Sequence, residues 1–171
     1  TKTNSISLKK EYGLSEKLIK ELSKEKQEPD WVLNIRLKAL KLFYELTDPD
    51  WGPDISYLDI NKIATYVKPI NNEKRSWDDV PEDIKNVFDK LGIPEAEKAS
   101  LAGSGAQFDS EVVYHNLTED LQKQGIIYTS FDEGIRKYPE LVKEYFTKAV
   151  PINDHKYIAL HYALFSGGSF V

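Results

Sequence analysis

The stretch from Pro29 to Pro49 constrains the fold more than any other part of the sequence. Between these prolines, apolar side chains recur at the spacing of one helix face, which predicts a long amphipathic helix. Pro29 suits a first helical position, and Pro49 stops the helix. Each large side chain of such a stripe stabilises the fold by about 1.5–3 kcal/mol when buried, so the helix needs a partner surface. The predicted stripe consists of Trp31, Ile35, Ala39, Leu42 and Leu46.

Two shorter helices are predicted from their end residues. Ser15 is placed to cap a helix, with Leu14 and Ile19 as a hydrophobic staple across its first turn. Pro81 opens another helix, and Gly92 stands where a left-handed C-cap belongs. Between these helices, residues 48–80 are punctuated by Asp, Pro and Asn, and the apolar runs are short. We interpret 48–80 as an irregular segment that wraps over other elements.

The second half of the sequence alternates between strands and helices. The predicted order is a strand at 110–115, a helix from 118 to 124, a short strand at 125–130, a helix interrupted by Pro139, and a last helix capped by Asn153 or Asp154. Gly167 and Gly168 end that helix, and strand-like residues follow. The sequence therefore predicts an α+β fold, with a mostly helical domain over 1–105 and a small α/β segment over 106–171.

Composition excludes several classes of site and partner. The 171 residues include no cysteine, which excludes disulfides, cysteine nucleophiles and cysteine-held clusters within this chain. The net charge of −5 gives no electrostatic footprint for nucleic acid. The sequence shows neither a secretory leader nor an apolar run long enough for a membrane span, so a cytoplasmic protein without membrane contact is expected.

Candidate chemical residues are few. His155 and His161 lie six positions apart, which does not place them side by side on a helix. We interpret His161 as a structural histidine on an apolar stripe, and His115 as a residue with a strand-end hydrogen bond; a site role for either is the alternative. Gly103 and Gly105 lack the Lys-Ser/Thr of a phosphate loop, so a hinge or turn is predicted there.

The aromatic residues leave two readings open. Trp31, Trp51 and Trp77 are interpreted as packing anchors for the irregular segment. An exposed aromatic patch that docks a partner is the alternative. No catalytic, cofactor-binding or metal-binding residue is assigned, and the chain is not expected to be an enzyme.

Four stretches, in this order along the chain, resemble a known family. They are "EKQEPDWVLNIRLKALKLF", "SWDDVPEDIKNVFDKLGIPEAEKASLAGSGAQFDSEVVYHNL", "QGIIYTSFDEGIRKYPELVKEYF" and "VPINDHKYIALHYALFSGGSFV". Together they resemble the amino-terminal part of SufB, the scaffold subunit of the SUF iron–sulfur cluster assembly machinery. The resemblance spans residues 14–171.

The resemblance implies a fold and partners for a longer protein. In that family the residues after the Gly-Gly-Ser-Phe-Val stretch continue into a right-handed parallel β-helix, so the chain is expected to stop at its first strand. SufB works with the ABC-type ATPase SufC, with SufD or a second SufB copy, and with sulfur donor proteins. Its iron–sulfur cluster is built outside the part matched here. Some members carry cysteines in the region corresponding to 60–78, and this chain has none there.

The resemblance leaves this segment with a structural role, as a helical cap that seals the first β-helix coil and offers surface to partners. Two alternatives stay open. One is a SufD-type sister subunit, and the other is a free-standing helical protein-interaction adaptor of an unrelated class.

Overall fold

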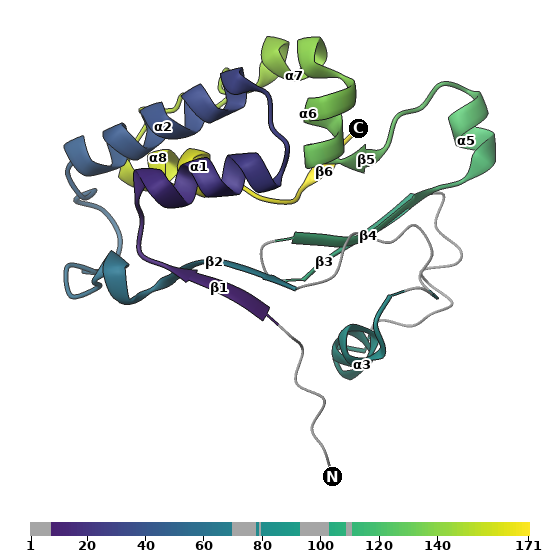
Figure 1. The fold of residues 1–171 in the computed structure, drawn as a ribbon, viewed down its shortest axis with the longest axis horizontal. Helices are drawn as coiled ribbons and strands as arrows, with labels where there is room; N and C mark the ends of the chain where they lie inside the picture. Colours follow the sequence, from purple (N-terminus) through teal and green to yellow (C-terminus); the bar gives the residue numbers. More distant parts are fainter. Residues whose placement is uncertain (1–7, 70–77, 79, 93–102, 109–110) are drawn as a thin grey trace. The chain divides into compact units, whose positions relative to one another are not determined.

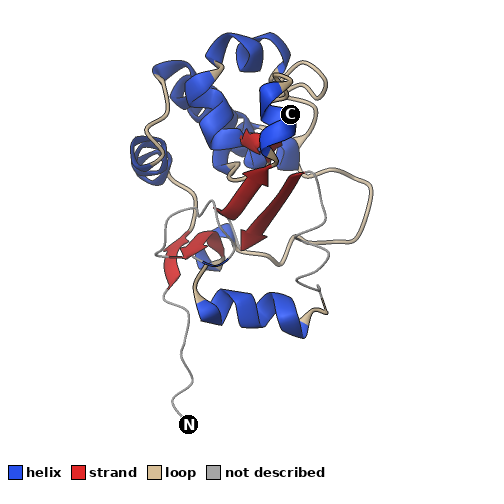
Figure 2. Ribbon diagram, turned by 90° about the vertical axis from the view of Figure 1, so that its right-hand side faces the viewer, coloured by secondary structure: helices blue, strands red, loops and turns tan. Residues whose placement is uncertain are grey.

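The computed structural model describes residues 8–69, 78, 80–92, 103–108 and 111–171 (Figure 1). Helices are the predominant element of this described part (Figure 2). The helices are α1 (Glu16–Glu25), α2 (Asp30–Glu45), α3 (Glu82–Lys90), α5 (Glu119–Lys123), α6 (Phe131–Lys137), α7 (Pro139–Tyr145) and α8 (Lys156–Leu164), with a 3-10 turn, η1, at Ile60–Lys62. The strands are β1 (Leu8–Tyr12), β2 (Ala64–Pro69), β3 (Gly103–Phe108), β4 (Glu111–Leu117), β5 (Thr129–Ser130) and β6 (Ser169–Phe170).

Contacts within the chain group it into two compact units. The helical unit consists of Lys10–Tyr66 and Asp132–Phe165, and the sheet unit consists of Thr1–Lys9, Val67–Phe131 and Ser166–Val171. Each unit therefore joins stretches that are far apart in the sequence. The predicted domain boundary after residue 105 stays a prediction, and residue 105 itself lies within β3.

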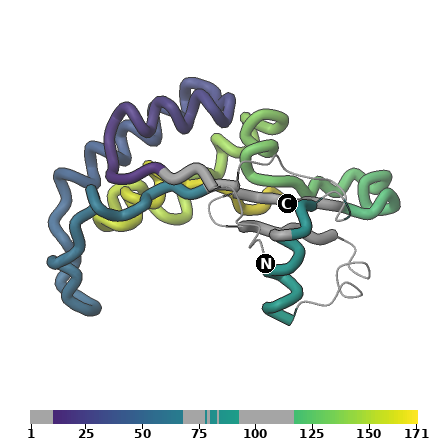
Figure 3. The backbone as a smooth tube through the Cα atoms, turned by 60° about the horizontal axis from the view of Figure 1, so that its bottom comes forward, coloured from purple at the N-terminus to yellow at the C-terminus, as the bar shows by residue number. Residues whose placement is uncertain are grey.

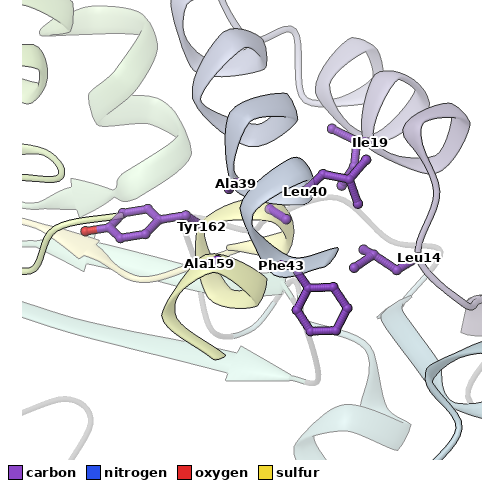
Figure 4. Close-up of a cluster of buried hydrophobic side chains, with 8 residues drawn as sticks. Leu14, Ile19, Ala39, Leu40, Phe43, Ala159 and Tyr162 are labelled. Atoms are coloured by element: carbon purple, nitrogen blue, oxygen red, sulfur yellow. The ribbon is translucent and has the colours of Figure 1, made fainter. Parts of the chain in front are cut away.

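The core of the helical unit forms where α2 packs against both α1 and α8. Leu14, Ile19 and Leu40 lie beside one another where α1 meets α2 (Figure 4). This contact confirms that Leu14 and Ile19 share one apolar cluster, as the predicted staple requires. The buried cluster consists of Leu14, Ile19, Ala39, Leu40, Phe43, Ala159, Tyr162 and Ala163.

The buried face of α2 differs from the predicted stripe. Ala39 is buried as expected, but Trp31, Ile35, Leu42 and Leu46 are only partly buried. The helix carries apolar residues around most of its circumference, so periodicity alone did not select the centre of the buried face. Packing against two other helices selected it. The buried residues are Val32, Arg36, Ala39, Leu40 and Phe43.

Local end signals are confirmed in the structure. The Ser15 side chain accepts a hydrogen bond from the Leu18 N–H at 3.2 Å, so Ser15 caps α1. Pro81 precedes α3, and Gly92 follows it with φ +74°, a left-handed conformation that favours glycine. Pro139 separates α6 from α7, as predicted.

Other local expectations were wrong. Gly103 and Gly105 belong to β3, which pairs antiparallel with β4 so that Gly105 stands opposite His115; they do not form a hinge or turn. Glycine has a low strand propensity, and here pairing with β4 overrides it. Strand β2 lies within the segment predicted to be irregular, and β1 was not predicted. The 125–130 strand is reduced to β5. The α8 N-cap is His155, because its Nδ1 accepts from the Tyr157 N–H and stands in for the expected Asn or Asp oxygen.

The last strand follows the Gly-Gly pair, as predicted. Gly167 and Gly168 both have positive φ, and β6 pairs antiparallel with β5. The Phe131 N–H also donates to the Gly168 carbonyl at 3.0 Å, which extends this pairing by one hydrogen bond. In the described part of the chain, β5 and β6 form a two-stranded sheet, and the parallel β-helix stays a prediction.

Candidate functional site

The most deeply buried charged group described in the helical unit is Arg36 on α2. Its side chain has no exposed surface, and the Glu28 side chain beside it is 2% exposed. The Arg36 Nη2 lies 2.5 Å from Glu28 Oε1, and Nε lies 2.8 Å from Oε2. This two-point contact matches the planar fork of a guanidinium to a carboxylate. The pair is therefore a buried, geometrically specific ion pair.

The same guanidinium also binds the end of α8. Arg36 Nη1 donates to the Ala163 carbonyl at 3.1 Å, and Nη2 donates to the Phe165 carbonyl at 2.9 Å. The Phe165 ring lies over the guanidinium, with 3.7 Å between Cζ and the ring centroid. The last carbonyls of a helix lack partners within the helix. Arg36 therefore caps α8 and anchors the chain just before Ser166.

A second buried ion pair joins α1 to α6. Lys26 Nζ lies 2.6 Å from Asp132 Oδ2, with side-chain exposures of 6% and 14%. Arg136 Nη1 donates to the Lys26 carbonyl at 3.1 Å, one α6 turn beyond Asp132. Both interactions link residues more than 100 positions apart. They hold the amino-terminal helices of the helical unit to its carboxy-terminal ones.

The histidines do not form a cluster on α8. His155 lies at its N-cap, while His161 lies in its last turn and is exposed. The interpretation of His161 as a structural residue on an apolar stripe was therefore wrong, because the buried face of α8 is formed by Ala159, Tyr162 and Ala163. His115 lies in β4, and its side chain is outside what the structure describes. Within the described residues, no group of three or more His, Asp or Glu side chains is placed to hold a metal ion.

The tryptophans divide between the two readings. Trp31 is partly buried, and its indole Nε1 is buried without a hydrogen-bond partner among the described residues. Trp51 is 62% exposed, which agrees with the reading of an exposed aromatic residue, although one contact joins it to the start of α8. Its ring meets His155 edge-on at a centroid distance of 5.3 Å. Trp77 lies outside the described residues.

Comparison with known proteins gives the family relationship. No family model matches the chain. A protein of Staphylococcus haemolyticus named iron-sulfur cluster assembly SufBD family protein is 54% identical over 161 residues, which are 94% of this chain and 35% of that protein. Proteins of Staphylococcus saprophyticus and Staphylococcus aureus with the same family name are 53% and 52% identical over the same shares. The chain is homologous to SufBD family proteins.

This SufBD homologue spans about a third of the length of the curated relatives it matches. None of its described helices is both long and apolar enough to cross a membrane. The buried ion pairs of Arg36 with Glu28 and of Lys26 with Asp132 join residues within the helical unit, so their role there is structural. The lack of cysteine means that no thiolate of this chain ligates a cluster.

Sequence reasoning missed the Arg36–Glu28 pair of the SufBD homologue. One clue was present, because Arg36 stands four positions after Val32 and four before Leu40 on an otherwise apolar face. A cation in that position needs a buried anion. Asp30 and Glu28 were the nearby candidates in the sequence, and the structure selects Glu28. The carbonyl partners of Arg36 could not be found this way, because they lie 127 and 129 residues away.

Proposed function

We propose that this chain is the amino-terminal part of a SufB-type scaffold subunit for iron–sulfur cluster assembly. The supporting observation is the 54% identity to SufBD family proteins over 94% of the chain. The SufB assignment comes from the collinear sequence stretches described above. In the proposal, the whole protein works in the cytoplasm with a SufC-type ATPase and with SufD or a second SufB copy, and the cluster is built on a β-helix outside this chain.

The role proposed for this segment is structural. The buried pairs of Arg36 with Glu28 and of Lys26 with Asp132 tie the two ends of the helical unit together. The Arg36 contacts stop two residues before the Gly167–Gly168 turn that leads into β6. We propose that these contacts fix the end of α8, the last element of the helical unit before the chain continues into β6.

A SufD-type subunit is the second candidate, because the family name of the relatives covers both. The two are separated by anaerobic reconstitution of the full-length protein with iron and sulfide. A SufB-type scaffold retains an iron–sulfur chromophore after desalting, whereas a subunit that does not hold the cluster loses it.

The structural role is tested by removing residues 1–100 from the full-length protein and measuring its stability and its assembly with SufC and SufD. The proposal expects a lower melting temperature and a weaker complex. A finer comparison uses Arg36→Met against Lys41→Met, an exposed lysine on the same helix. If the truncated protein is as stable as the intact one and assembles with SufC and SufD equally well, the structural role is wrong.

A further inference from the structure

The segment between α2 and η1 exposes large apolar side chains on the helical unit. Trp51 is 62% exposed, Tyr57 78% and Leu58 49%. In Figure 3 this segment is the blue-to-teal part of the tube that coils back on itself after α2. We name residues 48–59 the aromatic loop. Tryptophan and tyrosine dominate binding energy at protein interfaces, so an exposed Trp51 and an exposed Tyr57 on one short loop indicate a contact surface.

The aromatic loop is also strongly acidic. It contains no lysine or arginine, and its carboxylates are Asp48, Asp50, Asp54 and Asp59. The hydrogen bond from the Tyr157 hydroxyl lowers the pKa of Asp48 most, and the contact with Lys156 lowers it further. A hydrogen bond from the Ser56 backbone N–H likewise lowers the pKa of Asp54. Lys156 lies 3.2 Å from Asp48 and Lys62 lies 3.4 Å from Asp59, so these two carboxylates are partly neutralised within the helical unit. The negative charge that the loop presents to a partner is therefore chiefly that of Asp50 and Asp54.

Internal contacts preorganise the aromatic loop. Asp54 Oδ1 accepts a hydrogen bond from the Ser56 N–H at 2.9 Å. The Leu58 N–H donates to the Ile55 carbonyl at 2.9 Å, so the chain makes two successive turns over residues 54–58. Pro49 and Pro53 restrict the backbone before these turns. A loop that is already shaped loses little conformational entropy on binding, which raises its affinity for a partner.

We propose that the aromatic loop is a docking surface for an arginine-bearing segment of a partner protein. Arginine fits both halves of the surface, because its guanidinium stacks on aromatic faces and pairs with carboxylates in two-point contacts. Leu58 offers an apolar contact for the methylene stem of such a side chain. This inference rests on the proposed function, in which the whole protein works with partner subunits, and it adds the chemistry of one contact surface.

The test uses the full-length protein and a synthetic nonapeptide in which four arginines alternate with small and apolar residues. Binding is measured by fluorescence anisotropy of the labelled peptide. We expect Trp51→Ala and Tyr57→Ala each to weaken binding by about tenfold, the loss typical of an interface hot spot. Asp50→Asn should weaken it by about threefold, and the effect of Asp50 should shrink at high salt.

Matched controls separate the aromatic loop from general surface effects. Tyr145 on α7 is a tyrosine of similar exposure, 65%, so Tyr145→Ala should leave peptide affinity unchanged. Asp89→Asn on the exposed side of α3 is the control for Asp50→Asn. A peptide with glutamate in place of arginine should not bind. Circular dichroism shows whether each variant is folded. If Trp51→Ala unfolds the protein, the peptide affinity of Tyr57→Ala is the test of the proposal.

The proposal would be overturned by no binding of the arginine peptide, by equal losses in the loop variants and the controls, or by equal binding of the glutamate peptide. Dimerisation that Tyr57→Ala abolishes, without peptide binding, would assign the surface to a second copy and also overturn it. The assay does not measure cluster assembly, so its failure leaves the proposed scaffold role untouched. Failure of cluster reconstitution likewise leaves the peptide result intact.

Discussion

Replacing Arg36 with methionine tests whether the buried ion pair holds the helical unit together. The substitution leaves the Glu28 carboxylate, 2% exposed, without its cation, and removing one partner of a buried pair costs about 3–5 kcal/mol. The carbonyls of Ala163 and Phe165 lose their donors as well, at about 1–3 kcal/mol for each group that stays dry. Because the loop after α8 can relax toward water, we expect a total loss of about 4–6 kcal/mol.

A loss of this size is comparable to the whole stability of many domains, about 5–15 kcal/mol. The free energy of unfolding is measured by urea titration, followed by far-ultraviolet circular dichroism of the full chain at low temperature. Glu28→Met and the double variant complete a double-mutant cycle. We expect the double variant to be more stable than the sum of the single losses predicts, by about 2–3 kcal/mol, because neither charge is then left unpaired.

Lys41→Met is the matched control on the same helix. Lys41 pairs with Glu45 at 3.6 Å, but its side chain is 75% exposed, so its loss should change the free energy of unfolding by less than about 0.5 kcal/mol. The reasoning would be refuted if Arg36→Met cost less than about 1 kcal/mol, or if the two single losses added without coupling.

Two further predictions concern the ends of helices. Ser15→Ala removes the acceptor of the Leu18 N–H and should destabilise the helical unit by about 1 kcal/mol, while Ser15→Asp should restore most of it, as measured by urea titration. Asp48→Asn should lower the melting temperature at neutral pH, because Tyr157 and Lys156 hold the folded pKa of Asp48 below its unfolded value of about 3.9. The contribution of a lowered carboxyl pKa is present above the unfolded value and lost as the pH falls through the folded one. The melting temperatures of the two proteins should therefore begin to converge below about pH 3.9 and coincide once the pH is below the folded pKa of Asp48. A difference that stayed constant to lower pH would contradict this assignment.

Sequence predictions were accurate where the interaction that determines the structure joins residues close together in the sequence. Ser15, Gly92 and Pro139 act on backbone groups within a few residues of themselves, so their effects could be predicted from neighbours alone. The helix around Ala39 was predicted for the same reason, since its periodicity is a local property. The absence of cysteine is likewise complete in the sequence, and it excludes thiolate chemistry whatever the fold.

The tertiary structure decided what these elements contact. The sequence of α2 alone does not determine whether position 36 faces solvent or the core. In the structure Arg36 is buried, and its guanidinium binds the Glu28 carboxylate and the carbonyls of Ala163 and Phe165. Gly105 lies in a strand because β4 supplies its hydrogen-bond partners, although glycine itself favours turns. The core of the helical unit is formed by other side chains, and Trp51 is left 62% exposed. The pair of Lys26 with Asp132 and the contact of Arg36 with Ala163 join residues more than 100 positions apart, and no local pattern contains that information.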